Sequence, residues 1–463
     1  MANALRARRE PNRVLKEVLQ TVAEIRKQNL KFDADTYLAM LTAYARTRNN
    51  GQVLNVLEQM AADGFEPTVE AYNIVLESYT AKGFSRFRNE FLELMKKNNV
   101  TYNAWTYMHV LKGLCKEDEL EHALDFMENM KNKRIEVSLM SYVQLVACCL
   151  RLNDSQTAMY LLKEAEATHQ NLDSQPLLIM DAMRVAAFTD DHDGVRYCWE
   201  RAVDKYNMRP DEGTCLDVLR VAAKSADPPL ATDVIRQLSK SGFVYKEHYF
   251  TPLIDAFAKR KDLKSAFNVL DIMRSSGVTP TKQSTRGILG NLNTIEDIDE
   301  AYYVLEEIRR ENRNVDVTAF NAVVEACALA EDVNRTVATY REASALGVTM
   351  DVDTYNAVLL MCVKTQSRGL GNVVIEEMKK ADVAPNLDTY TTMVRLACTQ
   401  HNYEDAFTYI EEMKSYDVVP PAECYNTLAR KLAAEKDPRF HIALEEMTTF
   451  GYRIPESTKQ LWK

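Results

Sequence analysis

Apolar residues recur at helical spacing along the chain, in pairs of short stripes that are separated by charged spacers. A clear example is the segment YMHVLKGLCKEDELEHALDFMENM, residues 107–130, in which the run KEDE divides two apolar stripes. Residues three or four positions apart share one face of a helix. The apolar positions are Val110, Leu111 and Leu114 before the spacer and Leu120, Ala123, Leu124, Phe126 and Met127 after it. This pattern predicts a hairpin of two amphipathic helices, which is too small to bury a core alone.

The hairpin repeats every 35 residues. Aromatic residues mark one column of the repeat, at Tyr37, Tyr72, Tyr107, Tyr142, Phe250, Phe320, Tyr355, Tyr390 and Tyr425. Methionine follows 23 residues later in many units, at Met60, Met95, Met130, Met273, Met378 and Met413. The interval from 174 to 211 is three residues longer than the others. Twelve units begin at residues 34, 69, 104, 139, 174, 212, 247, 282, 317, 352, 387 and 422.

A fixed period of this length is typical of solenoids, in which each hairpin buries its apolar face against its neighbours. The chain is therefore predicted to be all-α. We expect a basic segment with one leading helix at 1–33, a repeat array at 34–456 and a short tail at 457–463. Gly (14) and Pro (13) are scarce among the 463 residues, as expected for a mostly helical chain.

The formal net charge of −10 argues against a protein that coats nucleic acid through bulk charge. Charge is unevenly distributed, because residues 1–31 hold eight Lys or Arg against three Glu. This basic start lacks the apolar core of a secretory signal, so it is either the remainder of a targeting segment or an expression boundary. No apolar run is long enough to predict a membrane span.

Nine cysteines, without any CxxC pair, are predicted to be buried free thiols in a reducing compartment. The segment TDDHDG at 189–194 lacks the spacing of a calcium loop and is predicted to join two helices. No sequence motif of a deaminase, a P-loop enzyme or a zinc protease is present. We therefore expect no enzyme activity, no cofactor and no metal, and no small-molecule substrate.

Hairpins of the form VxxYNxLIxxLCKxGxxxxAxxLxxEMxxxGxxP are typical of the pentatricopeptide repeat family. The segment MHVLKGLCKEDELEHALDFMENM resembles that pattern almost position for position. The resemblance extends over most of the chain, is weakest at 174–246, and is to the plain 35-residue (P-type) repeats. It implies a right-handed α-solenoid superhelix of about twelve helix-turn-helix repeats. Proteins similar to this chain are mostly organellar RNA-binding proteins.

In that family the fifth and thirty-fifth residues of a repeat read one RNA base between them. Carried over to this chain, Asn321 with Asp351 matches the uracil type. The pyrimidine type is matched by Asn73 with Asn103 and by Asn356 with Asn386. Apolar fifth residues cannot hydrogen-bond a base edge. They occur at Leu38, Met108, Val143, Leu178 and Leu216. The resemblance thus predicts only a weak sequence code.

Two further positions of the repeat carry charges that would affect RNA binding. The thirteenth residue is cationic in six units, as Arg46, Lys116, Arg151, Lys224, Lys259 and Lys364, and is never acidic. These residues are either phosphate contacts along the groove or cations favoured at a helix C-terminus. The second residue is acidic in five units, as Asp35, Glu70, Asp353, Asp388 and Glu423. Carboxylates there are typical of a helix N-terminus and should repel an RNA strand.

We therefore expect a non-catalytic RNA-binding protein of organellar gene expression, in mitochondria or alternatively in plastids. Its partners would be mRNA or rRNA, contacted through the concave face of the array. The alternative is a structural subunit of an organellar ribosome or another large complex, which would bind rRNA and neighbouring proteins. A processing factor that recruits a separate nuclease is a third possibility.

Overall fold

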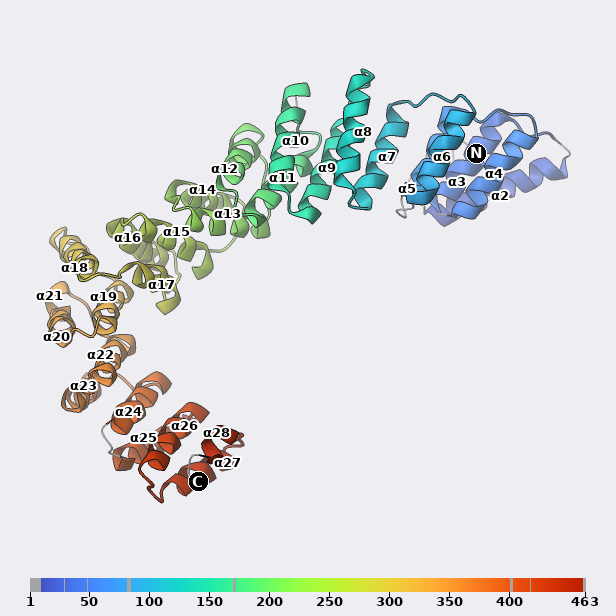
Figure 1. The fold of residues 1–463 in the computed structure, drawn as a ribbon. Helices are drawn as coiled ribbons and strands as arrows, with labels where there is room; N and C mark the ends of the chain where they lie inside the picture. Colours follow the sequence, from blue (N-terminus) through green and yellow to red (C-terminus); the bar gives the residue numbers. More distant parts are fainter. Residues whose placement is uncertain are drawn as a thin grey trace. The chain divides into compact units, whose positions relative to one another are not determined.

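The computed structural model of the chain describes residues 10–28, 30–47, 49–80, 85–169, 172–399, 403–416 and 418–460. These residues form helices and short connections, and none of them lies in a β-strand. The helices divide into two compact units, Met1–Val221 and Ala222–Lys463. Figure 1 shows the helices in chain order, each hairpin followed by the next.

In the first unit, α2 (Pro11–Lys27) precedes the hairpins and packs on the first of them. The first helices of the hairpins are α3 (Ala34–Arg46), α5 (Val69–Thr80), α7 (Ala104–Lys116), α9 (Leu139–Leu152) and α11 (Pro176–Phe188). The second helices are α4 (Asn50–Ala62), α6 (Ser85–Lys97), α8 (Leu120–Asn132), α10 (Ser155–Thr168) and α12 (His192–Trp199). Each first helix contacts the next first helix, so these helices form a continuous row.

In the second unit the same alternation continues. The boundary between the units falls within α13 (Glu212–Lys224). The first helices are α15 (Glu247–Lys259), α17 (Lys282–Asn291), α19 (Val317–Leu329), α22 (Val352–Lys364), α24 (Leu387–Thr399) and α26 (Ala422–Ala434). The others are α14 (Pro228–Lys240), α16 (Leu263–Ser275), α18 (Ile295–Arg310), α20 (Val333–Arg341), α21 (Ala343–Leu346), α23 (Arg368–Lys380), α25 (Tyr403–Ser415), α27 (Phe440–Thr449) and α28 (Glu456–Gln460).

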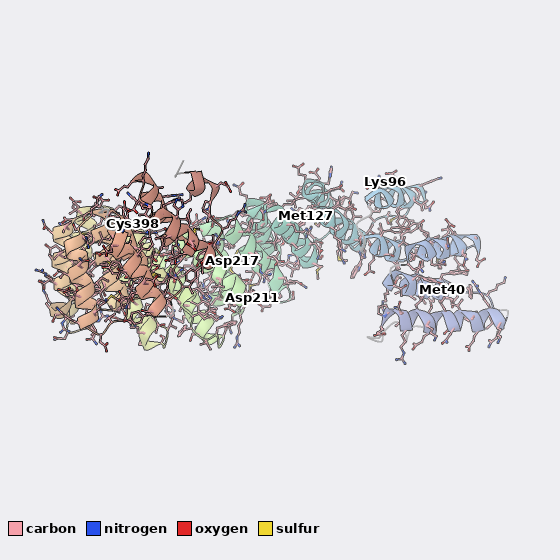
Figure 2. The ribbon with its side chains drawn as sticks, turned by 90° about the horizontal axis from the view of Figure 1, so that it is seen from below. Met40, Lys96, Met127, Asp211, Asp217 and Cys398 are labelled. Carbon is pink, nitrogen blue, oxygen red and sulfur yellow. The ribbon has the colours of Figure 1, made fainter. Side chains whose placement is uncertain are left out.

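The repeated apolar columns build the core. The aromatic column is buried throughout, and the methionine column is buried as well, with Met95, Met130, Met273, Met378 and Met413 at 0% exposure. Met127 lies on α8 and Cys398 on α24, and both side chains are buried (Figure 2). All nine cysteines are buried, and none forms a disulfide. The prediction of an all-α array of stacked helical hairpins is thus confirmed within each unit.

The long interval at 174–211 has a local structural cause. Helix α11 begins at Pro176, two residues after the predicted start of its unit. Helix α12 then continues directly into a π-helix, η1 (Glu200–Lys205), which adds residues without starting a new element. The TDDHDG segment joins α11 to α12, and Asp191 caps α12 by accepting a hydrogen bond from the Gly194 amide at 3.0 Å.

Two absences apply to the described residues. No helix there has the length and apolar character needed to span a membrane. No group of three or more His, Cys, Asp or Glu side chains is arranged there to hold a metal ion. The organisation of the chain into a segment at 1–33, an array at 34–456 and a tail at 457–463 stays a prediction, and residues 1–9 and 461–463 lie outside the described residues.

Candidate nucleic-acid interface

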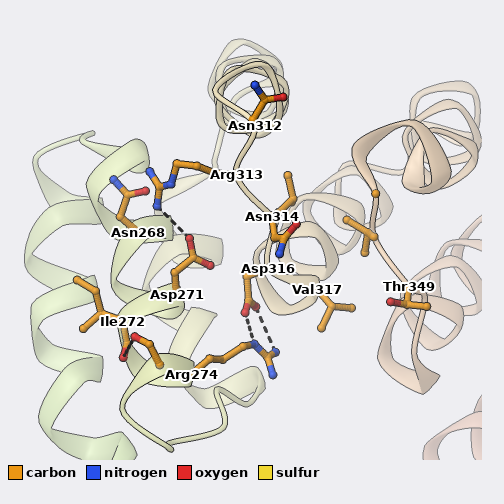
Figure 3. A pocket seen from close by; sticks show the side chains of 14 residues that line it. Asn268, Asp271, Ile272, Arg274, Asn312, Arg313, Asn314, Asp316, Val317 and Thr349 are labelled. Carbon is orange, nitrogen blue, oxygen red and sulfur yellow. Dashed lines mark hydrogen bonds and ion pairs between the residues drawn. The ribbon is translucent and has the colours of Figure 1, made fainter.

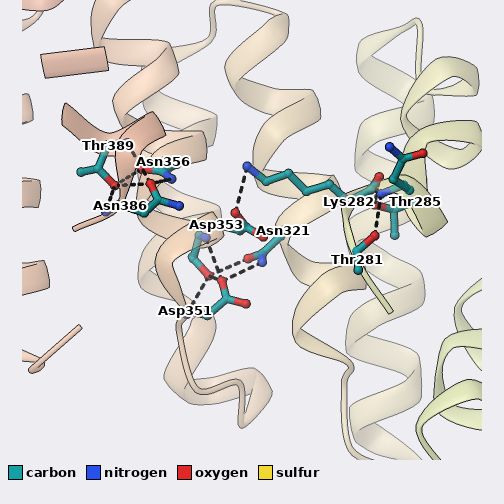
Figure 4. Close-up of polar contacts among 11 residues, drawn as sticks. Thr281, Lys282, Thr285, Asn321, Asp351, Asp353, Asn356, Asn386 and Thr389 are labelled. Carbon is teal, nitrogen blue, oxygen red and sulfur yellow. Dashed lines mark hydrogen bonds and ion pairs between the residues drawn. The ribbon is translucent and has the colours of Figure 1, made fainter. Parts of the chain in front are cut away.

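The structure brings together all three pairs of predicted base-reading residues. In each pair the fifth-residue asparagine donates from Nδ2 to Oδ1 of the thirty-fifth residue, which caps the next first helix. The distances are 3.0 Å for Asn73 and Asn103, 2.9 Å for Asn321 and Asp351, and 3.1 Å for Asn356 and Asn386. Figure 4 shows the latter two pairs at the start of α22 and α24. Asn73, Asn321 and Asn356 are 6–7% exposed, so their side chains are held firmly.

A threonine, which sequence reasoning missed, locks each pair. It is the third residue of the following unit, Thr106, Thr354 or Thr389, and its side chain is fully buried. Its backbone N–H donates to Oδ1 of the capping residue at 3.0 Å in all three places. Its hydroxyl donates to the asparagine Oδ1 at 2.7, 2.5 and 2.7 Å. Asn or Asp followed three residues later by Thr is the signal that would have found it.

This network decides which groups remain for a base. A backbone N–H can only donate, so the atom of Asn103 that faces Thr106 is the oxygen, and Nδ2 is left without an acceptor among the described residues. The Asn–Asn pairs therefore present N–H donors. At Asp351 the same position is a carboxylate, whose second oxygen is an acceptor. Uracil offers a donor at N3 where cytosine offers an acceptor, so the two kinds of pair should prefer different pyrimidines.

At the N-termini of α13 and α17, a long charged side chain from the preceding unit contacts the capping residue in place of an asparagine. Arg184 donates to Thr214 Oγ1 at 3.2 Å and to Asp211 Oδ1 at 3.0 Å. Glu247 accepts from the hydroxyl groups of Thr281 and Ser284, both at 2.6 Å. These caps are satisfied within the protein by a long charged side chain, so they present no asparagine to a base.

The Asn73–Asn103 pair lies in a pocket of about 550 Å³ between α5 and α7. The indole of Trp105 lines this pocket and is 62% exposed, which makes it available for stacking. The imidazole of His109 lies beside it, with the ring centroids 6.3 Å apart. Burial lowers the pKa of His109, so the ring is neutral near pH 7. The pocket thus combines a stacking surface with hydrogen-bonding groups, as a nucleobase requires.

The Asn356 side chain lies in a smaller pocket of about 310 Å³ in the second unit. Carboxylates line it together with two cations, Lys282 and Arg395. Lys282 forms an ion pair with Asp353 at 2.9 Å, and Arg395 forms one with Glu423. Two of the second-residue acids that were expected to repel RNA are therefore paired with cations.

Three residues of the cationic thirteenth-residue column contact the ends of neighbouring helices. Arg151 donates to Asp118 Oδ1 at 2.8 Å and also to the Cys115 carbonyl, at the end of α7. Lys259 donates to the Ala223 carbonyl at 2.9 Å, and Lys364 donates to the Leu329 carbonyl at 3.1 Å. These cations satisfy carbonyls that a helix end leaves unpaired. A lysine has three N–H donors, so such a contact leaves capacity for a phosphate. The phosphate role of this column stays a prediction.

Another hollow has none of the predicted site residues in its lining. It encloses about 950 Å³ and is bordered by α16, the connection from α18 to α19 and the connection after α21 (Figure 3). Arg274 pairs there with Asp316, which also caps α19, and Arg313 pairs with Asp271 at 3.0 Å. The charges in this hollow are therefore matched within the protein.

Comparisons with known families and proteins agree with this architecture. One family profile, described as pentatricopeptide repeat-containing protein, matches residues 71–165 and 212–343. Others match 309–437 (pentacotripeptide-repeat region of PRORP) and 20–82 (pentatricopeptide repeat domain). A pentatricopeptide repeat-containing protein of Arabidopsis thaliana is 22% identical over 60% of this chain and 43% of its own length. The mitochondrial 15S rRNA processing factor of Meyerozyma guilliermondii is 22% identical over 50% of this chain and 31% of its own.

Solved structures that align with this chain include the pentatricopeptide repeat protein PPR10 with an 18-nucleotide RNA element. It aligns with a TM-score of 0.47 and 18% identity over 97% of this chain and 65% of that chain. Yeast Rmd9p in complex with its 16-nucleotide target RNA aligns with a TM-score of 0.39 and 11% identity, covering 97% of this chain and 92% of that one. The chain spans less than half the length of the curated relatives named above.

Proposed function

Because this chain belongs to the pentatricopeptide repeat family, we propose that it is a non-catalytic RNA-binding protein that acts in organellar gene expression. One observation carries the proposal: three asparagine pairs, each locked by a buried threonine, present hydrogen-bonding groups beside the row of first helices. A buried network that ends in unused donors and acceptors is suited to reading unpaired bases. Relatives named as mitochondrial or chloroplastic support an organellar location. The proposal places the protein in the mitochondrion, with the plastid as the alternative.

The RNA would be single-stranded where it meets these pairs, with its phosphates toward the thirteenth-residue cations. Recognition would be local, because apolar fifth residues such as Leu38, Val143 and Leu216 offer no hydrogen bond to a base edge. Uracil is expected at the Asn321–Asp351 pair, and cytosine is expected at the two Asn–Asn pairs. Neighbouring bases would contribute by stacking and shape.

A second function is favoured by the contacts of the cationic column. Since Arg151, Lys259 and Lys364 already bind helix ends, a long phosphate track is less strongly supported than the base-reading pairs. A structural subunit of an organellar ribosome or another large complex would need only scattered contacts with rRNA and with neighbouring proteins. Such a subunit would use the same asparagine pairs at exposed rRNA loops.

Crosslinking of the protein to RNA in isolated organelles, followed by sequencing of the bound fragments, separates the two functions. A short footprint on one or a few mRNAs supports the regulatory role. Crosslinks to rRNA together with co-sedimentation with ribosomes support the structural role. Absence of any crosslinked RNA would overturn both.

The phosphate column has its own test. Charge reversal at Lys116, Arg151, Lys224 and Lys259 together should weaken RNA binding and flatten its dependence on salt. Each lost phosphate contact lowers the slope of log K against log salt by about 0.7 for a single strand. Because Arg151 and Lys259 also bind helix ends, circular dichroism must show that the variant is folded. An unchanged affinity and slope would eliminate the phosphate role.

A further inference from the structure

Lys282 reaches across a complete repeat. It is the first residue of α17, yet its Nζ lies 2.9 Å from Oδ1 of Asp353 on α22. Helix α19 packs against both α17 and α22, so the side chain passes over the unit between them (Figure 4).

The ammonium group lies in acidic surroundings. Lys282 lines the same pocket as the base-reading Asn356, together with the carboxylates of Glu325 and Asp388. Burial acts to lower the pKa of Lys282, but the hydrogen bond that its ammonium group donates to Asp353 and the charges of the nearby carboxylates hold this pKa above its usual value. The lysine is therefore fully charged. Besides Arg395, which is paired with Glu423, it is the cation that offsets the acids of this pocket.

We propose that Lys282 is an RNA-backbone contact of the Asn356 pocket, and that Asp353 holds its ammonium group in place until a phosphate of single-stranded RNA takes over. The inference rests on the proposed RNA-binding function and adds a contact that lies outside the thirteenth-residue column. Exchange of one anion for another costs little free energy here, because both side chains are partly exposed, at 47% and 36%, and ion pairs that solvent reaches contribute little to stability. The ammonium group has three donors and can bridge both anions during the exchange.

The proposal predicts opposite effects for the two halves of one ion pair. Lys282→Gln should weaken binding of short fluorescent oligocytidylate and oligouridylate several-fold, and should lower the salt slope by about 0.7. Asp353→Asn should strengthen binding several-fold, since it removes a competing charge and leaves the lysine in place. Both variants lose the same half-exposed ion pair, so their thermal midpoints should change little. Lys282→Arg should bind as the wild type does.

A matched control is available on two second helices of the compact unit Ala222–Lys463. Lys379 of α23 and Glu412 of α25 also form an ion pair at 2.9 Å, with exposed fractions of 49% and 23%. Lys379→Gln and Glu412→Gln should leave RNA affinity unchanged, because neither residue lines either of the asparagine pockets.

The outcomes distinguish failure of the proposed role of Lys282 from failure of the proposed RNA-binding function. If the wild type binds RNA and both Lys282→Gln and Asp353→Asn bind equally well, the inference is wrong and the function stands. Parallel losses of affinity and thermal stability in both variants would mean that the ion pair is structural, which also overturns the inference. If the wild type binds neither oligonucleotide nor any crosslinked RNA, both proposals fail.

Discussion

Asn321 donates a hydrogen bond from Nδ2 to Oδ1 of Asp351 at 2.9 Å, although the two residues are thirty positions apart in the chain. Asn73 and Asn356 make the same bond with an asparagine in place of the aspartate. The buried threonine fixes which atom of the capping residue points inward. The outward atom is therefore an oxygen at one pair and an N–H group at the other two. A single substitution can exchange these chemistries without disturbing the helix.

Asp351→Asn should change the preferred base at this position from uracil to cytosine. The new Nδ2 group would face the base ring nitrogen, which is a donor in uracil and an acceptor in cytosine. Discrimination should shift by about 1–3 kcal/mol, the range for a good base contact. Helix stability should hardly change, because Asn and Asp are comparable N-caps. Selection from a randomised RNA pool measures the preference, and Asn386→Asp should shift its own position the opposite way. Identical consensus sequences for all three proteins would contradict this prediction.

Trp105→Ala should weaken RNA binding with little loss of stability. The indole is 62% exposed beside the Asn73–Asn103 pair, and stacking of a base on an aromatic side chain contributes about 1–3 kcal/mol. The matched control is Tyr160→Ala on α10, which removes an aromatic ring that is 60% exposed but lies on a second helix. Titration with short RNA should show a loss for the first variant alone. Equal affinities for both variants would show that Trp105 does not stack on RNA.

Much of the fold could be predicted because periodicity reports burial, which is a local property. The column that begins with Tyr37 and Tyr72 was identified from spacing, and these side chains are buried. The spacing showed that the interval at 174–211 is three residues longer than the others, but it did not show that α12 continues into a π-helix there, because no hydrophobic period encodes a π-helix.

The site was only partly predictable from the sequence. The family resemblance named Asn321 and Asp351 as a pair, and the structure places them in contact. It did not indicate Thr354, whose role depends on hydrogen bonds made across two helices. The partner of Lys282 was equally hidden, since it lies 71 positions further along the chain. The sequence showed that cations recur at the thirteenth residue of the units. It could not show that Lys259 donates a hydrogen bond to the Ala223 carbonyl at the end of a neighbouring helix.

Arg274→Met should loosen the start of α19. Asp316, which caps this helix, has a side chain that is only 2% exposed and is paired with Arg274. Removal of the arginine leaves a buried carboxylate without its cation. The cost should be about 1–3 kcal/mol, below the usual range for a broken buried pair because Arg274 is itself 40% exposed. Faster amide hydrogen exchange at Thr318, whose N–H donates to Asp316 at 2.8 Å, would report the change. Arg310→Met removes an exposed pair with Glu306 and should leave this exchange unaltered.

Tyrosines whose pKa is raised by the fold should make the protein lose stability in alkaline solution. Burial, reinforced by the hydrogen bond to Asp63, raises the pKa of Tyr37 from 10.0 to about 12, and burial together with Glu166 raises the pKa of Tyr197 to about 12. Unfolded tyrosine thus releases its proton at lower pH than the folded residue does. Above pH 10 the folded state holds more protons than the unfolded state, so the free energy of unfolding falls as pH rises.

This contribution is fully present below about pH 10 and is lost progressively up to about pH 12. Urea midpoints followed by circular dichroism should therefore fall through that window, and tyrosinate absorbance should rise together with unfolding. Tyr37→Phe removes one such phenol, so its midpoint should depend less steeply on pH than that of the wild type, even though its midpoint at neutral pH is lower. Tyrosinate absorbance that rises near pH 10 while the helices stay intact would show that these phenols ionise normally in the folded protein.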